Sequence, residues 1–254
     1  MIYSDYKRNH AILKGRENAL HAFLNQNYKG IRHKWKNGFS SHSEDALTWS
    51  CFDIINLLPY DKKIVVLDEL IEDAFQGGCN FTFKNQAYTN NQIKIFVGKK
   101  YEGLTTNEAT EVDISIELPN RLIFFEAKLY SSISLADETK AIKYDQIAKK
   151  LRVGLDVCHG KEFYFIFLDI APAELLFLRK SKKEASHLGK MGFYDKWKSA
   201  WWFNYYKKGR NNSLKPLINC LEGIKIDPYQ KVSQNMGWLT WSDLYKSILR
   251  GLIK

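Results

Sequence analysis

Cysteine and proline are both scarce in this chain, with four and five residues among 254. The cysteines are widely separated and form no Cys-x-x-Cys pair, which argues against a zinc ribbon and a disulfide scaffold. We therefore expect reduced thiols in a cytoplasmic protein. The most apolar run, 163–178, is interrupted by charged residues and proline, and the first ten residues are polar and basic. Neither a membrane span nor a secretion signal is expected.

A glycine-rich phosphate loop is also missing, because no G-x-x-x-x-G-K-[ST] pattern occurs. ATP dependence within this chain is therefore not expected. Basic residues outnumber acidic ones. The chain has 38 Lys and Arg and 28 Asp and Glu, which gives a formal net charge of +10. A basic excess favours a polyanionic partner, because cations gather around phosphates and release counterions on binding.

The apolar periodicities predict helices alternating with strands, and hence an α/β fold. Helices are expected over 5–26, 44–58, 62–75, 136–155 and 242–252. Strands are expected over 93–101, 111–118, 121–128, 163–170 and 175–178. We expect a single domain with a core at about 41–180 and a basic, aromatic extension at about 181–254.

Two of the expected strands form a hairpin that carries acidic residues. A two-residue turn at Pro119-Asn120 sets a register in which Ser115 faces Phe124 and Asp113 faces Glu126. Side chains alternate along strands, so one face is uniformly apolar and is expected to face the core. That face consists of Ile114, Ile116, Leu118, Ile123, Phe125 and Ala127. The other face carries Asp113, Ser115, Glu117, Glu126 and Lys128.

Opposed carboxylates destabilise a hairpin unless something neutralises them, and a hard divalent cation with oxygen ligands does so. This predicts a metal site at Asp113 and Glu126, with Lys128 on the same face. The alternative is a solvated face on which Lys128 forms an ordinary surface pair with Glu111.

The sequence predicts four elements in order. They are a helix with an acid at its start, a hairpin that carries Asp113 and Glu126-Ala127-Lys128, a second helix and a further strand. This arrangement resembles the PD-(D/E)XK nuclease superfamily over about 44–170. Val112 stands where the named motif has proline. The resemblance implies a restriction endonuclease-like core, in which helices flank a central mixed β-sheet, with helical N- and C-terminal additions.

The resemblance also implies an activity: Mg²⁺-dependent hydrolysis of phosphodiester bonds, with Mn²⁺ as a substitute. Asp113, Glu126, Glu44 and Ala127 would hold the metal, and Lys128 would position the attacking water and stabilise negative charge. The leading expectation is a DNA endonuclease of restriction, defence or repair that acts on double-stranded DNA, with a homodimer left open. An RNA-directed nuclease and a non-catalytic nucleic-acid-binding protein are the alternatives.

Two further residues have competing interpretations. Glu44 stands where the superfamily often has a metal-binding acid, with Asp45 as its substitute, but Ser41-x-x-Glu44 also fits a helix capping box. Gln146 resembles a glutamine that exonuclease-like members use near the active site, or is a solvated helix residue. The aromatic and basic run 193–210 could stack on bases, although packing is the favoured interpretation.

Overall fold

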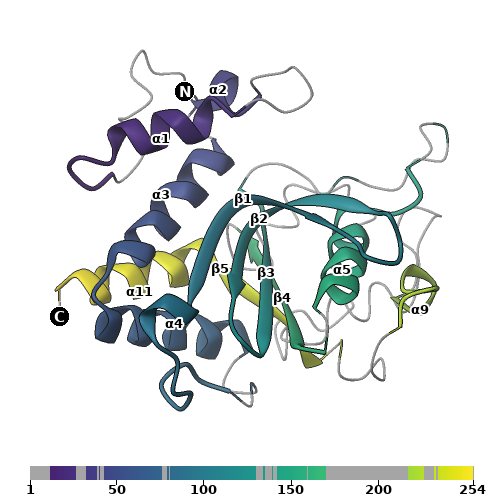
Figure 1. Ribbon diagram of the computed structural model, residues 1–254. Coiled ribbons are helices and arrows are strands. Elements are labelled where there is room, and N and C mark those ends of the chain that lie inside the picture. The colour runs from purple at the N-terminus through teal and green to yellow at the C-terminus, as the bar shows by residue number, and fades with distance from the viewer. Residues whose placement is uncertain are drawn as a thin grey trace, which may run out of the picture.

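A mixed five-stranded sheet forms the centre of the protein (Figure 1). The computed structural model describes residues 12–26, 33–38, 40, 43–75, 79, 81–129, 134, 139, 142–158, 160–169, 217–225, 232 and 234–253. The strands lie in chain order and are β1 (Lys94–Glu102), β2 (Ala109–Glu117), β3 (Arg121–Ala127), β4 (Glu162–Asp169) and β5 (Met236–Thr240). The β2 strand is antiparallel to both of its neighbours, β1 and β3, whereas β3, β4 and β5 are parallel.

Helices cover both faces of this sheet. They are α1 (Glu17–Leu24), α2 (His33–Gly38), α3 (Glu44–Leu57), α4 (Tyr60–Phe75), α5 (Gln146–Val157), α9 (Leu217–Cys220) and α11 (Trp241–Ile253), with a 3₁₀ turn, η2 (Asn90–Gln92). One core lies between the sheet and α3, α4 and α11, and a second lies between the opposite face and α5 and α9. The α1 helix packs on α3. The expected α/β architecture with a mixed sheet flanked by helices is confirmed.

The β2–β3 register follows the prediction from the turn. Ser115 pairs with Phe124 and Ile114 with Phe125, so the apolar face of the hairpin lies in the core beneath α3, as expected. Phe52 of α3 contacts Phe125 edge to face, with ring centroids 5.4 Å apart.

The opposite face of the hairpin is also covered, which makes the solvated-face interpretation wrong. Leu122 and Phe124 pack against α5 there, and Glu126 and Lys128 are 0% and 5% exposed. Glu111 forms its ion pair with Lys34, not with Lys128. The charged end of the hairpin therefore lies inside the protein.

Several boundaries differ from the expectations. Residues 142–145 are not helical, and α5 begins at Gln146, because the Asp145 side chain accepts hydrogen bonds from the amides of Ile147 and Ala148. The strand β5 was not expected, and it adds an edge to the sheet beside β4. The expected strand 175–178 and the aromatic run 193–210 lie outside the described residues.

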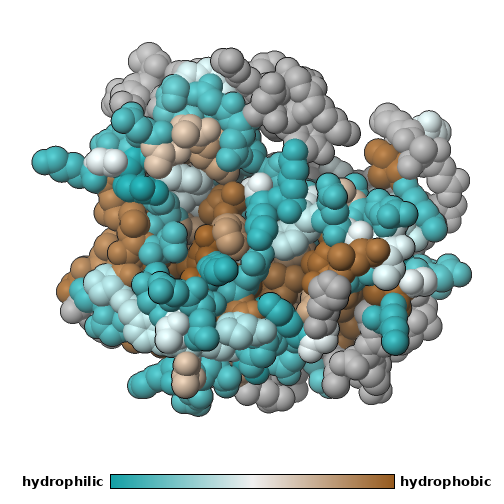
Figure 2. All heavy atoms as spheres, viewed as in Figure 1, coloured by the Kyte–Doolittle hydropathy of each residue, from teal (hydrophilic) through white to brown (hydrophobic). Residues whose placement is uncertain are grey.

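Among the described residues, no helix is both long enough and apolar enough to cross a bilayer. Hydrophobic side chains nevertheless gather on the surface where α3, α4 and α11 lie, at the left of Figure 2. The exposed large apolar residues of α3 and α11 are Leu57, Leu249, Leu252 and Ile253.

Close contact between α5 and the sheet depends on Gly154. A Cβ at this position would lie 2.2 Å from Phe163 Cζ and 3.1 Å from Phe124 Cδ2. We expect Gly154→Ala to lower the free energy of unfolding by about 1–3 kcal/mol, because overpacking outweighs the higher helix propensity of alanine. Urea denaturation measures this change. Lys149→Ala, at an exposed position of the same helix, is the control and should change the free energy of unfolding by under about 0.5 kcal/mol. Equal stability of the two variants would contradict the prediction.

Candidate active site

Three separate elements bring carboxylates to one end of the β2–β3 hairpin. Asp113 comes from β2, Glu126 from β3 and Glu44 from the first turn of α3. The last pair of the β2–β3 register is Ile114 with Phe125, and Asp113 and Glu126 are the next residues beyond this pair. Beyond that pair, Asp113 Oδ2 accepts a hydrogen bond of 2.8 Å from the amide of Ala127.

Two buried lysines contact these acids. Lys128 Nζ lies 2.8 Å from Glu126 Oε1 and 3.5 Å from Glu44 Oε1. Lys150 Nζ lies 3.1 Å from Asp113 Oδ1 and also forms an ion pair with Glu126 Oε2. Each oxygen of the fully buried Glu126 carboxylate therefore has an ammonium partner.

Burial and neighbouring charge set the pKa values of the two hairpin acids. Burial and the Asp113 charge raise the pKa of Glu126 to about 7, against the opposing effect of Lys150 and Lys128. Burial also acts to raise the pKa of Asp113, but the two lysines outweigh it and the pKa is lowered. Asp113 is therefore the more readily ionised member of the pair.

The two lysines remain charged despite their burial. Burial acts to lower the pKa of each ammonium, but the surrounding carboxylates outweigh it and raise both pKa values. Lys128 is also fixed through its backbone. Its amide donates to the carbonyl of Leu168 at 2.7 Å, and its carbonyl accepts from Trp241 Nε1 at 3.0 Å.

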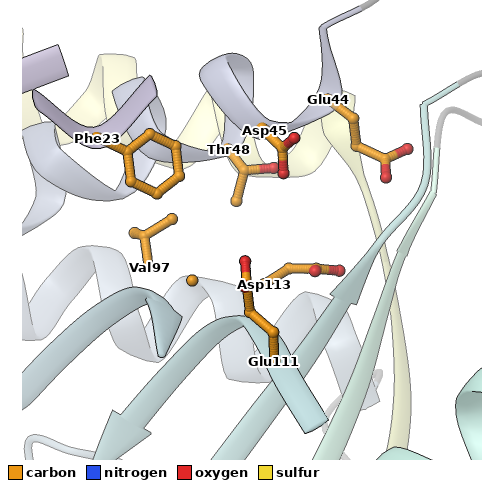
Figure 3. A pocket seen from close by; sticks show the side chains of 8 residues that line it. Phe23, Glu44, Asp45, Thr48, Val97, Glu111 and Asp113 are labelled. Atoms are coloured by element: carbon orange, nitrogen blue, oxygen red, sulfur yellow. The ribbon is translucent and has the colours of Figure 1, made fainter. Parts of the chain in front are cut away.

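An acidic pocket opens between α3 and the first two strands (Figure 3). Its lining includes four carboxylates, which are Glu44, Asp45, Glu111 and Asp113. Asp45 and Thr48 point from α3 into the pocket, with Asp113 across from them. Burial raises the pKa of Asp45 to about 6, helped by the nearby acids and opposed by Lys34. The other three carboxylates form ion pairs with lysines: Glu44 with Lys128, Glu111 with Lys34 and Asp113 with Lys150.

The start of α3 gives Glu44 a role other than capping. The N-cap residue is Ser43, which makes Glu44 the first helical residue, and Ser41 lies outside the described residues. Glu44 Oε2 instead accepts a hydrogen bond of 2.6 Å from the amide of Leu129. The structure thus brings Glu44 to the end of β3 beside Lys128, while Asp45 lines the pocket next to it.

Gln146 lies at the first position of α5, where its side-chain oxygen accepts a hydrogen bond of 3.3 Å from the amide of Ser134. Within α5, the side chain that contacts Asp113 and Glu126 belongs to Lys150, one turn after Gln146. Lys150 was not among the site residues predicted from the sequence. The available signal was a lysine within the apolar stripe formed by Ile147, Ala148 and Leu151.

No family model matches the chain, and no curated protein or solved structure matches it either. Within the part of the chain that the structure describes, no three His, Cys, Asp or Glu side chains are arranged to hold a metal ion. The donor chemistry nevertheless fits Mg²⁺, which prefers carboxylate oxygens. Asp113 Oδ1 and Glu126 Oε2 already converge on one cationic atom, the Nζ of Lys150.

Proposed function

We propose that this chain is a Mg²⁺-dependent nuclease that hydrolyses phosphodiester bonds, with a restriction endonuclease-like core of the PD-(D/E)XK kind. The observation that supports it most strongly is that Asp113 of β2, Glu126 of β3 and Glu44 of α3 gather at one site, together with Lys128, which directly follows β3. The order of α3, an antiparallel hairpin, α5 and the parallel strand β4 also supports it.

In this proposal, Asp113 and Glu126 hold the ion, with Glu44 and Ala127 completing the protein ligands and Mn²⁺ as a substitute. The bound ion supplies Lewis-acid activation of the phosphate and lowers the pKa of a water molecule. Lys128 orients that water and stabilises negative charge on the phosphate. Its fixed backbone, bonded to Leu168 and Trp241, supports such a positioning role.

The proposed substrate is double-stranded DNA, cut internally for restriction, defence or repair, and a homodimer would cut both strands. The net charge supports a nucleic-acid partner. Residues 170–216 alone contain 11 Lys or Arg and 3 Asp or Glu. RNA carries the same phosphates, so an RNA-directed nuclease is the alternative within this enzyme class.

A non-catalytic nucleic-acid-binding protein is a second candidate, and one observation favours it. Lys128 and Lys150 already pair with the buried Glu126 carboxylate, one on each oxygen. A site of this kind can be stable with no role in turnover.

The decisive experiment compares cleavage of supercoiled plasmid, linear duplex, single-stranded DNA and RNA in Mg²⁺, Mn²⁺ or EDTA. The variant is Asp113→Asn, because this side chain is 25% exposed and its loss leaves Lys150 paired with Glu126. The control is Glu117→Gln on the same strand, whose carboxylate bonds Lys99 and Tyr101 and not the site lysines.

We expect metal-dependent cutting by the wild type and by Glu117→Gln, and none by Asp113→Asn. Nucleic-acid binding without cutting by any variant, on all four substrates, would instead support the non-catalytic candidate. Cutting that persists in EDTA or in Asp113→Asn would contradict the proposed metal site.

Lys128→Met separates the role of this lysine from that of the acids. We expect turnover to fall by about 10²-fold, because the attacking water and the developing charge lose their ammonium partner. Affinity for Mg²⁺ should stay the same or rise, since a positive charge near the ion is removed. Single-turnover kinetics across a Mg²⁺ titration measure both quantities. A purely structural lysine would instead lower both through loss of folded protein.

A further inference from the structure

Lys150 occupies the space between the two hairpin carboxylates. Its Nζ lies 3.1 Å from Asp113 Oδ1 and forms an ion pair with Glu126 Oε2, so one cationic atom joins an oxygen of β2 to an oxygen of β3. The side chain is 3% exposed, and it enters from α5 on the far side of the sheet from α3. A cation that joins two carboxylates in this way has the position of a bridging metal ion.

A metal ion and this ammonium group cannot share that position. Mg²⁺ binds oxygen ligands at about 2.0–2.1 Å. An ion bound to both Asp113 Oδ1 and Glu126 Oε2 would overlap the Nζ of Lys150, which contacts the same two atoms. Metal binding at these acids therefore requires Lys150 to move.

Lys128 is not the group that must move. Its Nζ contacts Glu126 Oε1 and Glu44 Oε1, which are not the two oxygens that face Lys150. Its backbone is hydrogen-bonded on both sides, to Leu168 and Trp241. The Lys150 ammonium is carried on a flexible four-carbon side chain, so its displacement requires no movement of the α5 backbone.

We propose that Lys150 is an internal counter-ion, which holds the position of the metal in the metal-free protein and which the metal displaces on binding. This inference rests on the proposed function, since it concerns the same acids. In this role Lys150 neutralises Glu126, which is 0% exposed, because an unpaired buried carboxylate is strongly unfavourable.

Metal titration of a neutral variant tests the competition. Lys150→Met is expected to bind Mn²⁺ at least about tenfold more tightly than the wild type, because no cation has to leave. Isothermal titration calorimetry measures the affinity. Lys149→Met, which removes the same charge from an exposed neighbouring position on α5, should bind Mn²⁺ as the wild type does. Equal or weaker binding by Lys150→Met would overturn the inference.

A second measurement uses the wild type and is decisive if Lys150→Met does not fold. Anomalous diffraction from crystals with Mn²⁺ should place the ion between Asp113 and Glu126, with Lys150 Nζ more than about 4 Å from both carboxylates. An ion elsewhere, with the Lys150 ion pairs intact, would overturn the inference while leaving metal-dependent cleavage to be judged by the nuclease assay. If neither the wild type nor Lys150→Met binds Mn²⁺, the proposed metal site and the competition both fail.

Discussion

Glu126→Ala is expected to abolish cleavage, by a factor of about 10³ or more, and also to destabilise the protein. The Glu126 side chain is 0% exposed and is the shared partner of Lys128 and Lys150. Its removal leaves two buried ammonium groups without this carboxylate, and breaking a buried pair costs about 3–5 kcal/mol. Plasmid cleavage measures the first effect, and urea denaturation measures the second.

Glu117→Ala is the matched control for both effects. Glu117 lies on the same face of the hairpin, its side chain is 26% exposed, and it pairs with Lys99. We expect cleavage to be unchanged and the free energy of unfolding to fall by about 1 kcal/mol or less. Wild-type cleavage by Glu126→Ala would refute the proposed site. Full activity loss with unchanged stability would refute the claim that Glu126 neutralises the lysines.

Arg152→Leu is expected to lower the free energy of unfolding by about 3 kcal/mol. Arg152 is 4% exposed, and its Nε donates to both carboxylate oxygens of Glu108 at 2.9 Å. Its Nη1 donates to the carbonyls of Cys220 and Glu222, each at 2.8 Å, and its guanidinium lies 4.3 Å from the ring centroid of Tyr144. One side chain thus joins α5 to the turn before β2, to the last residue of α9 and to the turn that follows α9.

Arg250→Leu is the control for Arg152→Leu. Arg250 is 52% exposed at the side chain and has an ion pair of 3.5 Å with Glu69. Exposed pairs of this kind contribute about 0–1 kcal/mol, so the denaturation midpoint should hardly move. Similar midpoints for the two variants would show that the Arg152 contacts contribute little to stability.

The hairpin could be predicted from sequence because two local signals agreed. Pro119-Asn120 fixed the turn, and the alternation of apolar and polar residues fixed which side faces the core. Both came from residues close together in the chain, and the observed pairing of Ser115 with Phe124 follows from them.

The burial of Glu126 and Lys128 could have been predicted from the sequence. Leu122 and Phe124 lie on the same face of β3 as Glu126, so that face is partly apolar and requires a cover. The cover is α5, and Lys150 comes with it. No local pattern links Lys150 to Asp113, because they are 37 residues apart and meet only when α5 crosses the sheet.

The strand β5 was missed for a related reason. Gly237 weakens the strand signal of its short sequence, since glycine has low strand propensity. The structure shows why glycine is needed there. A Cβ at Gly237 would lie 2.8 Å from the carbonyl oxygen of Ala74, so only glycine allows α4 to approach β5 this closely.

The hydrogen bond from Trp241 to the Lys128 carbonyl joins residues 113 positions apart. Translation proceeds at about 5–20 residues per second, so roughly ten seconds pass between the synthesis of Lys128 and that of Trp241. Contacts this distant in sequence also slow folding, because a long loop has to close before they form. A nascent chain on the ribosome therefore carries both hairpin acids and Lys128 well before the second of the two backbone contacts of this lysine can form.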